Sequence, residues 1–409
     1  MIKIHKFIDT DKYIWCRDAA LIQVTEGKSA LKKSSSDCDY NTYDVKSVLT
    51  LNGKQLVQQE SPICPTCSGL LARGYGIENI NSKELQEIRD RINSEYHGLN
   101  KAIENISSVL ELLEDGYYVI ADSLLYPTDG QNHFFANVSD SMTYLAAAAD
   151  SYYVSEFLTA IGGFPAYLYP TQSNSSFNSE RISDYLDVID TENAPRAVAY
   201  YDYGFVCDLI DGHHKAYAAA VKGCVLPALV IIPLSYEYTN HITNTEYAGF
   251  AEIEIPVNEI PGYQRKKPIQ NSEVSFESVS NHNQPVPEDK FDFSSYPTID
   301  ELAGFMAADI VDEKITVELM EKWIHDKETD KLKYALIYYS KSDLECAEKM
   351  ARFIITTEDV LYANYQLIIL AYKVMSSFRN DETEKIMLDY LINHKNTDIA
   401  WDICSSYFE

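Results

Sequence analysis

Apolar residues recur at helical spacing along the last quarter of the chain. From residue 298 onward, short amphipathic segments alternate with polar breaks of a few residues. The spacing predicts consecutive helices, a pattern typical of helical-repeat arrays, although no specific repeat consensus accompanies it. We expect these helices at residues 298–309, 316–325, 330–340, 343–356, 358–377, 382–393 and 396–407.

The N-terminal third shows a different pattern. Residues 1–80 read as short strands and turns, and the alternation over Tyr43–Val57 contains Asn52-Gly53, a strong hairpin signal. Residues 82–113 instead place apolar side chains every three or four positions, which predicts one long helix or a pair broken near Gly98. A helix packed on its own protein explains this stripe more simply than an intermolecular coiled coil.

The middle of the chain mixes both periodicities. A strand is expected at 117–122, and helix at 146–149 and 154–161 before Gly162-Gly163. Residues 258–297 contain five prolines among many polar residues and read as a linker. We therefore predict an α+β multidomain protein, divided into a cysteine-containing β-rich module (1–80), a long amphipathic helix (81–116), an α+β domain (117–257, core 165–234), a linker (258–297) and a helical-repeat-like domain (298–409).

Charge narrows the classes of partner. The chain has 409 residues, with 62 acidic and 34 basic side chains and a formal net charge of −28. Nucleic-acid binding needs a cationic surface, so this balance argues against a DNA or RNA partner and equally against an anionic membrane surface. Because the first residues lack a signal-peptide pattern and no apolar run reaches about 18 residues, we expect a soluble, cytoplasmic protein.

Four of the eight cysteines lie in the first 67 residues: Cys16, Cys38, Cys64 and Cys67. The Cys64-Pro65-Thr66-Cys67 turn can present two thiolates to one metal ion, and Cys16 and Cys38 could complete a tetrahedral, structural zinc site, with His5 as a spare ligand. Ordinary buried or surface thiols are the alternative interpretation. A redox Cys-x-x-Cys would need a thioredoxin-like context, which the surrounding pattern lacks.

The strongest candidate for chemistry is the run Asp211-Gly212-His213-His214-Lys215, followed by an alanine-rich helix. A strand leads into Asp211-Gly212, and Asp211 is a candidate helix cap. The N-terminus of a helix carries free N–H donors and partial positive charge, which favour a phosphate, and Lys215 would add a full charge. His213 and His214 could bind phosphate oxygens or transfer protons. The alternative interpretation is an ordinary turn followed by a solvated first turn of helix. Cations at the N-terminus of a helix oppose its dipole, however, so these residues are not placed for helix stability. Their presence there favours a functional site.

The order of elements around this run is also informative. A Pro-containing strand over Ala166–Thr171 precedes a helix at 179–190, paired strands over Ala197–Ile210, the motif helix Gly212–Gly223 and a closing strand from Val225. This stretch of about 70 residues resembles the ParB/sulfiredoxin-like superfamily. The motif looks most like an Asp-Gly-His-[His/Thr]-Arg branch that includes free-amino-acid kinases.

The resemblance implies a nucleotide phosphate site formed by Asp211, Gly212, His213, His214 and Lys215, with Lys in place of Arg. Glu180 is the candidate for a separate general base. Sulfiredoxins place a cysteine where His213 stands, so sulfinic-acid reduction is not implied, and the basic motif of DNA-partitioning ParB proteins is also missing.

Two functions follow as hypotheses. The first is a nucleotide-dependent phosphotransferase or hydrolase that binds a nucleotide or phosphorylated small molecule, with Mg²⁺ bridging the phosphate to Asp211. The second is a non-catalytic nucleotide sensor or scaffold whose C-terminal helices bind a protein partner. A nuclease is a third class, which the acidic charge argues against.

Overall fold

The computed structural model describes residues 1–11, 13–35, 44–62, 70–74, 91–128, 130, 143–145, 152–154, 159–161, 163–171, 178–240, 243–263, 291–308, 315–357, 364–394 and 399–408. The chain divides into two compact units. Unit 1 comprises Met1–Tyr153 and Ala160–Ile299, and unit 2 comprises Val154–Thr159 and Asp300–Glu409. Among the described residues, every helix is too short or too polar to span a bilayer.

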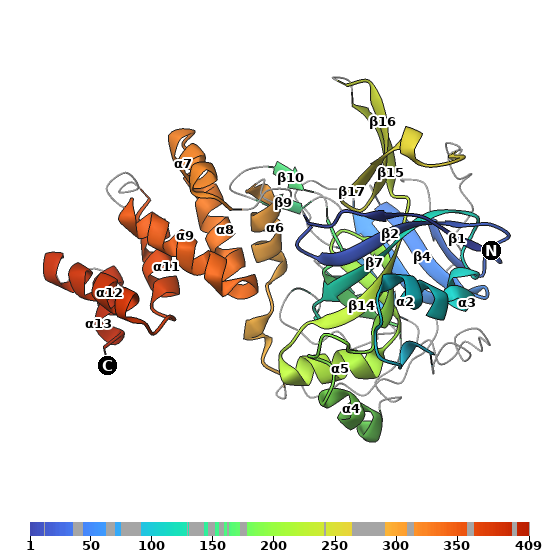
Figure 1. Ribbon diagram of the computed structural model, residues 1–409, viewed down its shortest axis with the longest axis horizontal. Helices are drawn as coiled ribbons and strands as arrows, with labels where there is room; N and C mark the ends of the chain where they lie inside the picture. The colour runs from blue at the N-terminus through green and yellow to red at the C-terminus, as the bar shows by residue number, and fades with distance from the viewer. Residues whose placement is uncertain are drawn as a thin grey trace. The chain divides into compact units, whose positions relative to one another are not determined.

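Unit 1 is built on a seven-stranded mixed sheet (Figure 1). Its strands, in sheet order, are β1 (Ile2–Ile8), β2 (Cys16–Val24), β7 (Gly116–Leu125), β14 (Leu226–Pro233), β12 (Ala197–Tyr203), β13 (Val206–Asp211) and β11 (Tyr167–Pro170). The central strands β7 and β14 are apolar runs buried over nearly their whole length, as expected for strands covered on both faces. β12 runs parallel to β14, and β11 runs parallel to β13.

A second, antiparallel sheet of unit 1 contains β3 (Leu31–Ser35), β4 (Asp44–Leu51), β5 (Lys54–Pro62), β6 (Leu70–Gly74) and β8 (Thr143–Leu145). The predicted hairpin is confirmed: Asn52 and Gly53 connect β4 to β5, and both have positive φ, 51° and 73°. This is the backbone conformation that makes Asn-Gly favourable in a two-residue hairpin turn. A smaller antiparallel sheet consists of β15 (Tyr236–Asn240), β16 (Thr245–Phe250) and β17 (Ile253–Pro256).

The helices of unit 1 are α2 (Leu99–Asn105), α3 (Ser107–Leu110), α4 (Ser179–Leu186) and α5 (His213–Lys222). α5 packs on β12 and β14 and against α4. Small side chains at 216, 218, 219 and 220 are fully buried and allow the close packing of α5 on the sheet.

Several predictions from the sequence are confirmed in this region. The strands at 197–203, 205–210 and 226–234 and the helices at 179–190 and 216–222 correspond to β12, β13, β14, α4 and α5, with ends shifted by a few residues. The stripe over 82–113 is a broken pair rather than one helix in its described part, where α2 begins after Gly98.

Two predictions are corrected. Residues 1–80 do not form a separate module, because β2 pairs along its length with β7, so β1 and β2 are part of the main sheet. The helix expected at 154–161 is wrong in the described residues, which form the short strands β9 (Tyr152–Val154) and β10 (Thr159–Ile161). Most of the linker predicted over 258–297 lies outside the described residues.

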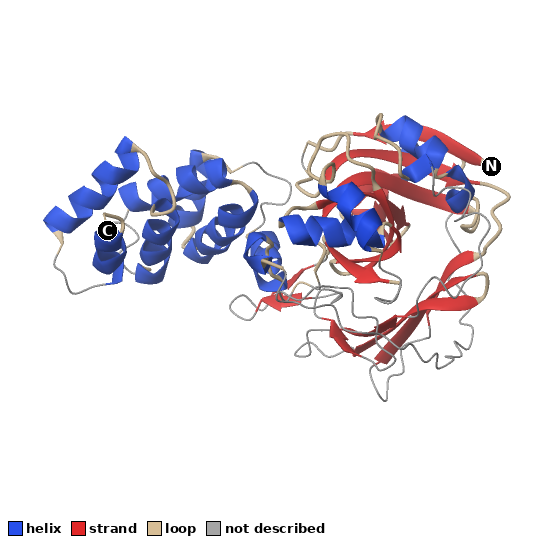
Figure 2. Cartoon of the chain, turned by 90° about the horizontal axis from the view of Figure 1, so that it is seen from below, coloured by secondary structure: helices blue, strands red, loops and turns tan. Residues whose placement is uncertain are grey.

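The described C-terminal residues form a group of helices, as predicted (Figure 2), and several neighbouring helices pack against one another. The described helices are α6 (Ile299–Ala307), α7 (Val317–His325), α8 (Thr329–Ser342), α9 (Leu344–Thr356), α11 (Tyr365–Met375), α12 (Asp381–Asn393) and α13 (Ile399–Ser406). Polar residues placed before four of them accept a backbone N–H of the first turn and fix where each helix begins. These caps are Thr316, Asp343, Asn364 and Asn380.

Candidate functional site

The predicted motif lies where β13 ends and α5 begins. Gly212, not Asp211, is the N-cap of α5, and its φ of 109° is in the region that favours glycine. A Cβ at this position would stand 2.6 Å from the Cβ of Ala197 on β12. The turn therefore requires glycine both for its backbone conformation and for the close approach of the neighbouring strand.

Two helix N-termini meet at this point of the fold. β11 and β13 are parallel and end side by side, β11 leading toward α4 and β13 directly into α5. The Asn178 side chain accepts the N–H groups of Glu180 and Arg181 and caps α4. Among the described residues, no side chain caps the first turn of α5. The carboxyl ends of parallel strands, next to helix N-termini, are where open α/β folds commonly bind anionic ligands.

His213 and His214 accept hydrogen bonds from the two ends of the connection between β11 and α4. The backbone N–H of Thr171 donates to His213 Nε2 at 3.1 Å, and that of Asn178 donates to His214 Nε2 at 3.0 Å. Each ring therefore carries its own proton on Nδ1. Both side chains are buried, so the solvated first turn considered from the sequence is not what the structure contains.

Burial also sets the protonation of His213. Burial, and to a lesser degree the neighbouring His214, lowers the pKa of His213 to about 3. The imidazole is thus neutral near pH 7, which keeps Nε2 available as an acceptor for Thr171. This arrangement suits a positioning residue better than the proton-transfer role expected from the sequence.

Lys215 points back into the protein rather than toward solvent. It is fully buried, and its Nζ donates to the carbonyl oxygens of Arg196 (2.9 Å) and Ile92 (3.1 Å). The Asp211 carboxylate lies 3.9 Å away, and the Tyr185 ring centroid lies 5.7 Å away. Burial lowers the pKa of Lys215 to about 8, with Asp211 acting in the opposite direction. Lys215 therefore connects α5, β12 and residue 92.

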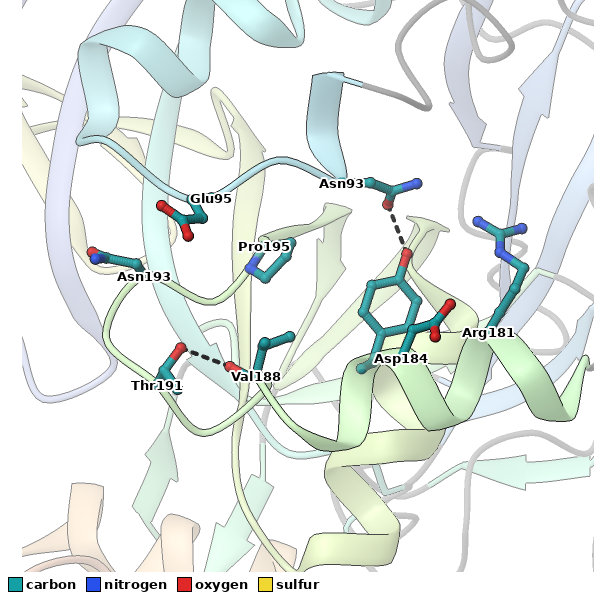
Figure 3. A pocket seen from close by; sticks show the side chains of 9 residues that line it. Asn93, Glu95, Arg181, Asp184, Val188, Thr191, Asn193 and Pro195 are labelled. Atoms are coloured by element: carbon teal, nitrogen blue, oxygen red, sulfur yellow. Dashed lines mark hydrogen bonds between the residues drawn. The ribbon is translucent and has the colours of Figure 1, made fainter.

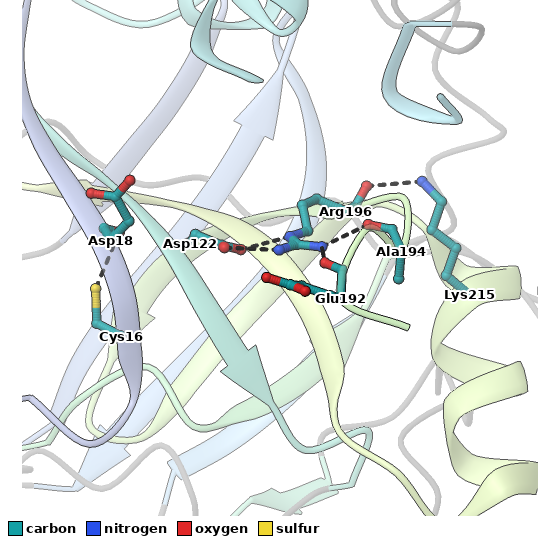
Figure 4. Close-up of polar contacts among 7 residues, drawn as sticks. All are labelled: Cys16, Asp18, Asp122, Glu192, Ala194, Arg196 and Lys215. Atoms are coloured by element: carbon teal, nitrogen blue, oxygen red, sulfur yellow. Dashed lines mark hydrogen bonds and ion pairs between the residues drawn. The ribbon is translucent and has the colours of Figure 1, made fainter. Parts of the chain in front are cut away.

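A buried ion pair supports the same strand end (Figure 4). Arg196 makes a two-pronged interaction with Asp122 of β7, with N–O distances of 2.7 and 2.9 Å. Its guanidinium also donates to the carbonyls of Glu192 and Ala194 and lies 3.7 Å from the Tyr96 ring centroid. Because the guanidinium is hydrogen-bonded to the Asp122 carboxylate and to two carbonyl oxygens, the pair can be buried without an uncompensated charge.

The remaining predicted site residues lie at different depths. Asp211 is partly buried, and its carboxylate lies 3.9 Å from Lys215 Nζ. Glu180 is exposed in the first turn of α4, on the element that His214 contacts through Asn178. Its backbone, not its carboxylate, takes part in the cap of that helix.

A pocket of about 440 Å³ runs along α4 (Figure 3). Its lining combines Arg181 at one end with Asp184 and Tyr185 on the same helix, while Asn93 and Glu95 come from the segment facing α4. The Tyr185 hydroxyl donates to Asn93 Oδ1 at 2.9 Å. The lining of the pocket is thus both polar and apolar, and the centroid of the Tyr185 ring that lines it lies 5.7 Å from Lys215 Nζ.

The zinc prediction lies mostly outside the described residues, since Cys38, Cys64 and Cys67 are not among them. Cys16 is buried on β2, donates to the Asp18 carbonyl at 3.3 Å, and has a pKa raised by burial. In the described part of the chain, no three His, Cys, Asp or Glu side chains are grouped to hold a metal. A structural zinc ion therefore stays a prediction.

Sequence reasoning missed Thr171, Asn178, Arg196 and Asp122. Asn178, immediately before an amphipathic helix, carried a recognisable capping signal. Arg196 stood alone at the start of a strongly apolar strand, which is the usual sign of a paired buried cation. Its partner is 74 residues earlier and had no local signal.

Comparison of the chain with family models, with curated proteins and with solved structures finds no match.

Proposed function

We propose that unit 1 binds the phosphoryl group of a nucleotide or phosphorylated small molecule at the start of α5, and acts as a nucleotide-dependent phosphotransferase or hydrolase. The observation that carries the proposal is the first turn of α5, which no described side chain caps and which begins at the ends of two parallel strands. Backbone N–H groups in such a position attract a phosphate, and the adjacent N-terminus of α4 adds its own partial positive charge.

The roles of the motif residues follow from their contacts. Gly212 lets β12 approach the start of α5 closely, and Lys215 ties α5 to the residue before β12 through the Arg196 carbonyl. His213 and His214 hold the entry and exit of the β11–α4 connection beside the helix start. Asp211 can supply a carboxylate oxygen to Mg²⁺ accompanying the phosphate. Proton transfer by Glu180 or His214 stays a prediction from the sequence.

The pocket along α4 gives the rest of the ligand a place. Arg181 lies in the first turn of α4, at the end of that pocket, and is close enough to influence the charge of Lys215. A cation there can bind a phosphate oxygen while the polar remainder of the ligand contacts Asp184, Asn93 and Glu95. A volume of about 440 Å³ falls in the range of small-molecule sites.

The test is ligand-dependent stability of the full chain. We expect ATP, ADP or CTP with Mg²⁺, or pyrophosphate as the minimal ligand, to stabilise unit 1 by about 2.7 kcal/mol at a hundredfold excess over Kd. Arg181→Ala should weaken binding, measured by calorimetric titration. Lys222→Ala is the matched control, because Lys222 lies at the opposite end of α5 and pairs with Asp190 at 2.7 Å. Absence of any shift with these ligands, or equal losses in both variants, would refute the proposal.

A scaffold role for the C-terminal helices is the second candidate, favoured by one observation. On α12, Leu388 and Ile392 are one turn apart and are 48% and 70% exposed. Two large apolar side chains on one exposed face suit a protein contact. Under this hypothesis, Leu388→Ser/Ile392→Ser should abolish capture of a partner that the unaltered chain retains, and unchanged capture would exclude this face.

A further inference from the structure

The small sheet β15–β16–β17 presents aromatic rings to solvent. The strand pairing places Tyr236 and Tyr238 of β15, Tyr247 of β16 and Glu254 of β17 on one face, because Tyr236 pairs with Gly249, Tyr238 with Tyr247, and Gly249 with Glu254. Tyr236 is 42% exposed and Tyr238 is 37% exposed. In Figure 1, β15 and β16 extend away from the seven-stranded sheet of unit 1. We call these four residues the tyrosine face.

The rings are held in fixed positions. Tyr238 and Tyr247 are stacked, with centroids 5.3 Å apart and planes within 15°, and the Tyr236 centroid lies 6.2 Å from that of Tyr238. The Glu254 carboxylate accepts both hydroxyls of β15, from Tyr236 at 3.0 Å and from Tyr238 at 2.9 Å. Tyr236 lies across Gly249, where any Cβ would overlap its ring. Exposed side chains ordered in this way lose little conformational entropy when they bind a partner.

The segment of chain that carries the tyrosine face is acidic. Between Lys222 and Arg265 the sequence contains five glutamates and no lysine or arginine. One of these, Glu259, is paired with Lys6 at 2.6 Å, whereas Glu254 receives hydroxyl groups, which leave its negative charge in place. Burial and the hydrogen-bonded Glu254 carboxylate raise the pKa of Tyr238 to about 12.

We propose that the tyrosine face binds an arginine-bearing segment of a partner protein. A planar guanidinium can lie against a tyrosine ring while its N–H groups reach a carboxylate, and Glu254 is held at the edge of two such rings. Nucleic acid would be repelled by this charge, and so would a second copy of a chain whose net charge is −28. A purely apolar partner would leave Glu254 buried without a cation. The proposal does not depend on phosphate binding at α5.

The test uses a fluorescently labelled tetra-arginine peptide and the full-length protein at 0.15 M salt, with binding followed by anisotropy. We expect Glu254→Gln and Tyr238→Leu each to weaken binding by about tenfold. The matched controls are Glu345→Gln and Tyr365→Leu in the C-terminal helices, which remove the same charge and an exposed tyrosine elsewhere. Both controls should stay within about twofold of the unaltered chain.

Two further measurements separate specific from general attraction. Tetra-lysine carries the same charge without the planar group, so it should bind several-fold more weakly. Tyr238→Phe keeps the ring and loses the hydroxyl contact, so it should retain most of the affinity. It also shows whether a loss of affinity in Tyr238→Leu reflects misfolding. Equal losses in the site and control variants, equal binding of both peptides, or no binding would overturn the proposal.

Discussion

At the scale of single residues, the side chains of His213, His214 and Lys215 form hydrogen bonds within the protein and are buried from solvent. Lys215 donates to two backbone carbonyls, and both imidazoles accept from backbone amides. A buried carbonyl or amide without a partner costs about 1–3 kcal/mol, so these polar side chains stabilise the turn around the helix start. A lysine at the N-terminus of a helix opposes the helix dipole. The hydrogen bonds of Lys215 to residues outside its own helix compensate for this unfavourable position.

The first prediction concerns His213 and pH. Its pKa of about 3 in the folded protein lies below the ordinary value of 6.5. Between these values the unfolded chain takes up a proton that the folded chain does not, so this residue lowers the free energy of unfolding as pH falls. From pH 7 to pH 5 the contribution amounts to about 2 kcal/mol. His213→Gln should remove that part of the pH dependence, measured by urea unfolding at several pH values.

The control for this prediction is His325→Gln. His325 lies at the end of α7 with its side chain exposed, so its replacement should leave the slope of stability against pH unchanged. If His213→Gln and the unaltered chain lose stability in parallel as pH falls, the buried neutral imidazole is not the cause.

At the scale of elements, local periodicity predicted most of the described elements over residues 179–233. α4, β12, β13, α5 and β14 are each short runs whose apolar spacing and flanking Gly, Pro or Asn residues identify both type and approximate ends. Pairing was not predictable in this way. β2 pairs with β7 although about 100 residues separate them, and nothing local in either strand specifies that partner.

The failed helix at 154–161 has a local cause. The stretch Tyr152–Val154 is aromatic and β-branched, and such residues favour strands over helices. The alanine run before it suggested helix, but the described residues after it form β9 and β10. The candidate site was likewise predictable only in part. Its motif was visible in the sequence, but the residues that contact the motif come from other elements and depend on the tertiary fold. These are Thr171, Asn178 and Ile92.

The second prediction concerns the turn into α5. Gly212→Ala combines an unfavourable φ of 109° with a Cβ 2.6 Å from Ala197 Cβ, so we expect a loss of about 2–4 kcal/mol in unfolding free energy. Gly223→Ala is the control: Gly223 also has a positive φ, 65°, but among the described residues its added Cβ would meet only Ser295 Oγ, at 3.5 Å. The difference between the variants, measured by denaturant unfolding, reports the steric contact together with the less favourable φ of Gly212.

A second substitution can separate strain from contact. Ala197→Gly in the Gly212→Ala background removes the opposing Cβ, so part of the lost stability should return if the contact matters. Equal stability of Gly212→Ala and Gly223→Ala would show that the approach of β12 places no special demand on this position.

At the scale of the whole molecule, the chain comprises two compact units with separate cores. In unit 1 the buried strands β7 and β14 form the centre, whereas in unit 2 the buried residues come from facing helices such as α9 and α11. Periodicity predicted a change from mixed to purely helical spacing near residue 298, but it did not assign residues 154–159 to unit 2, as the structure does. The number of sheets in unit 1 depends on long-range pairing and could not be predicted.

The third prediction follows from these separate cores. Calorimetry of the full chain should show two transitions, since each unit buries its own apolar side chains. Met350→Ala on α9 removes a fully buried side chain from unit 2 and should cost about 2–5 kcal/mol, lowering one melting temperature by roughly 8–20 °C. Ile231→Ala in β14 makes the corresponding cavity in unit 1 and should lower the other transition alone. If each substitution lowers both transitions together, the two units unfold as one cooperative body, and a ligand bound at α5 would then stabilise the C-terminal helices as well.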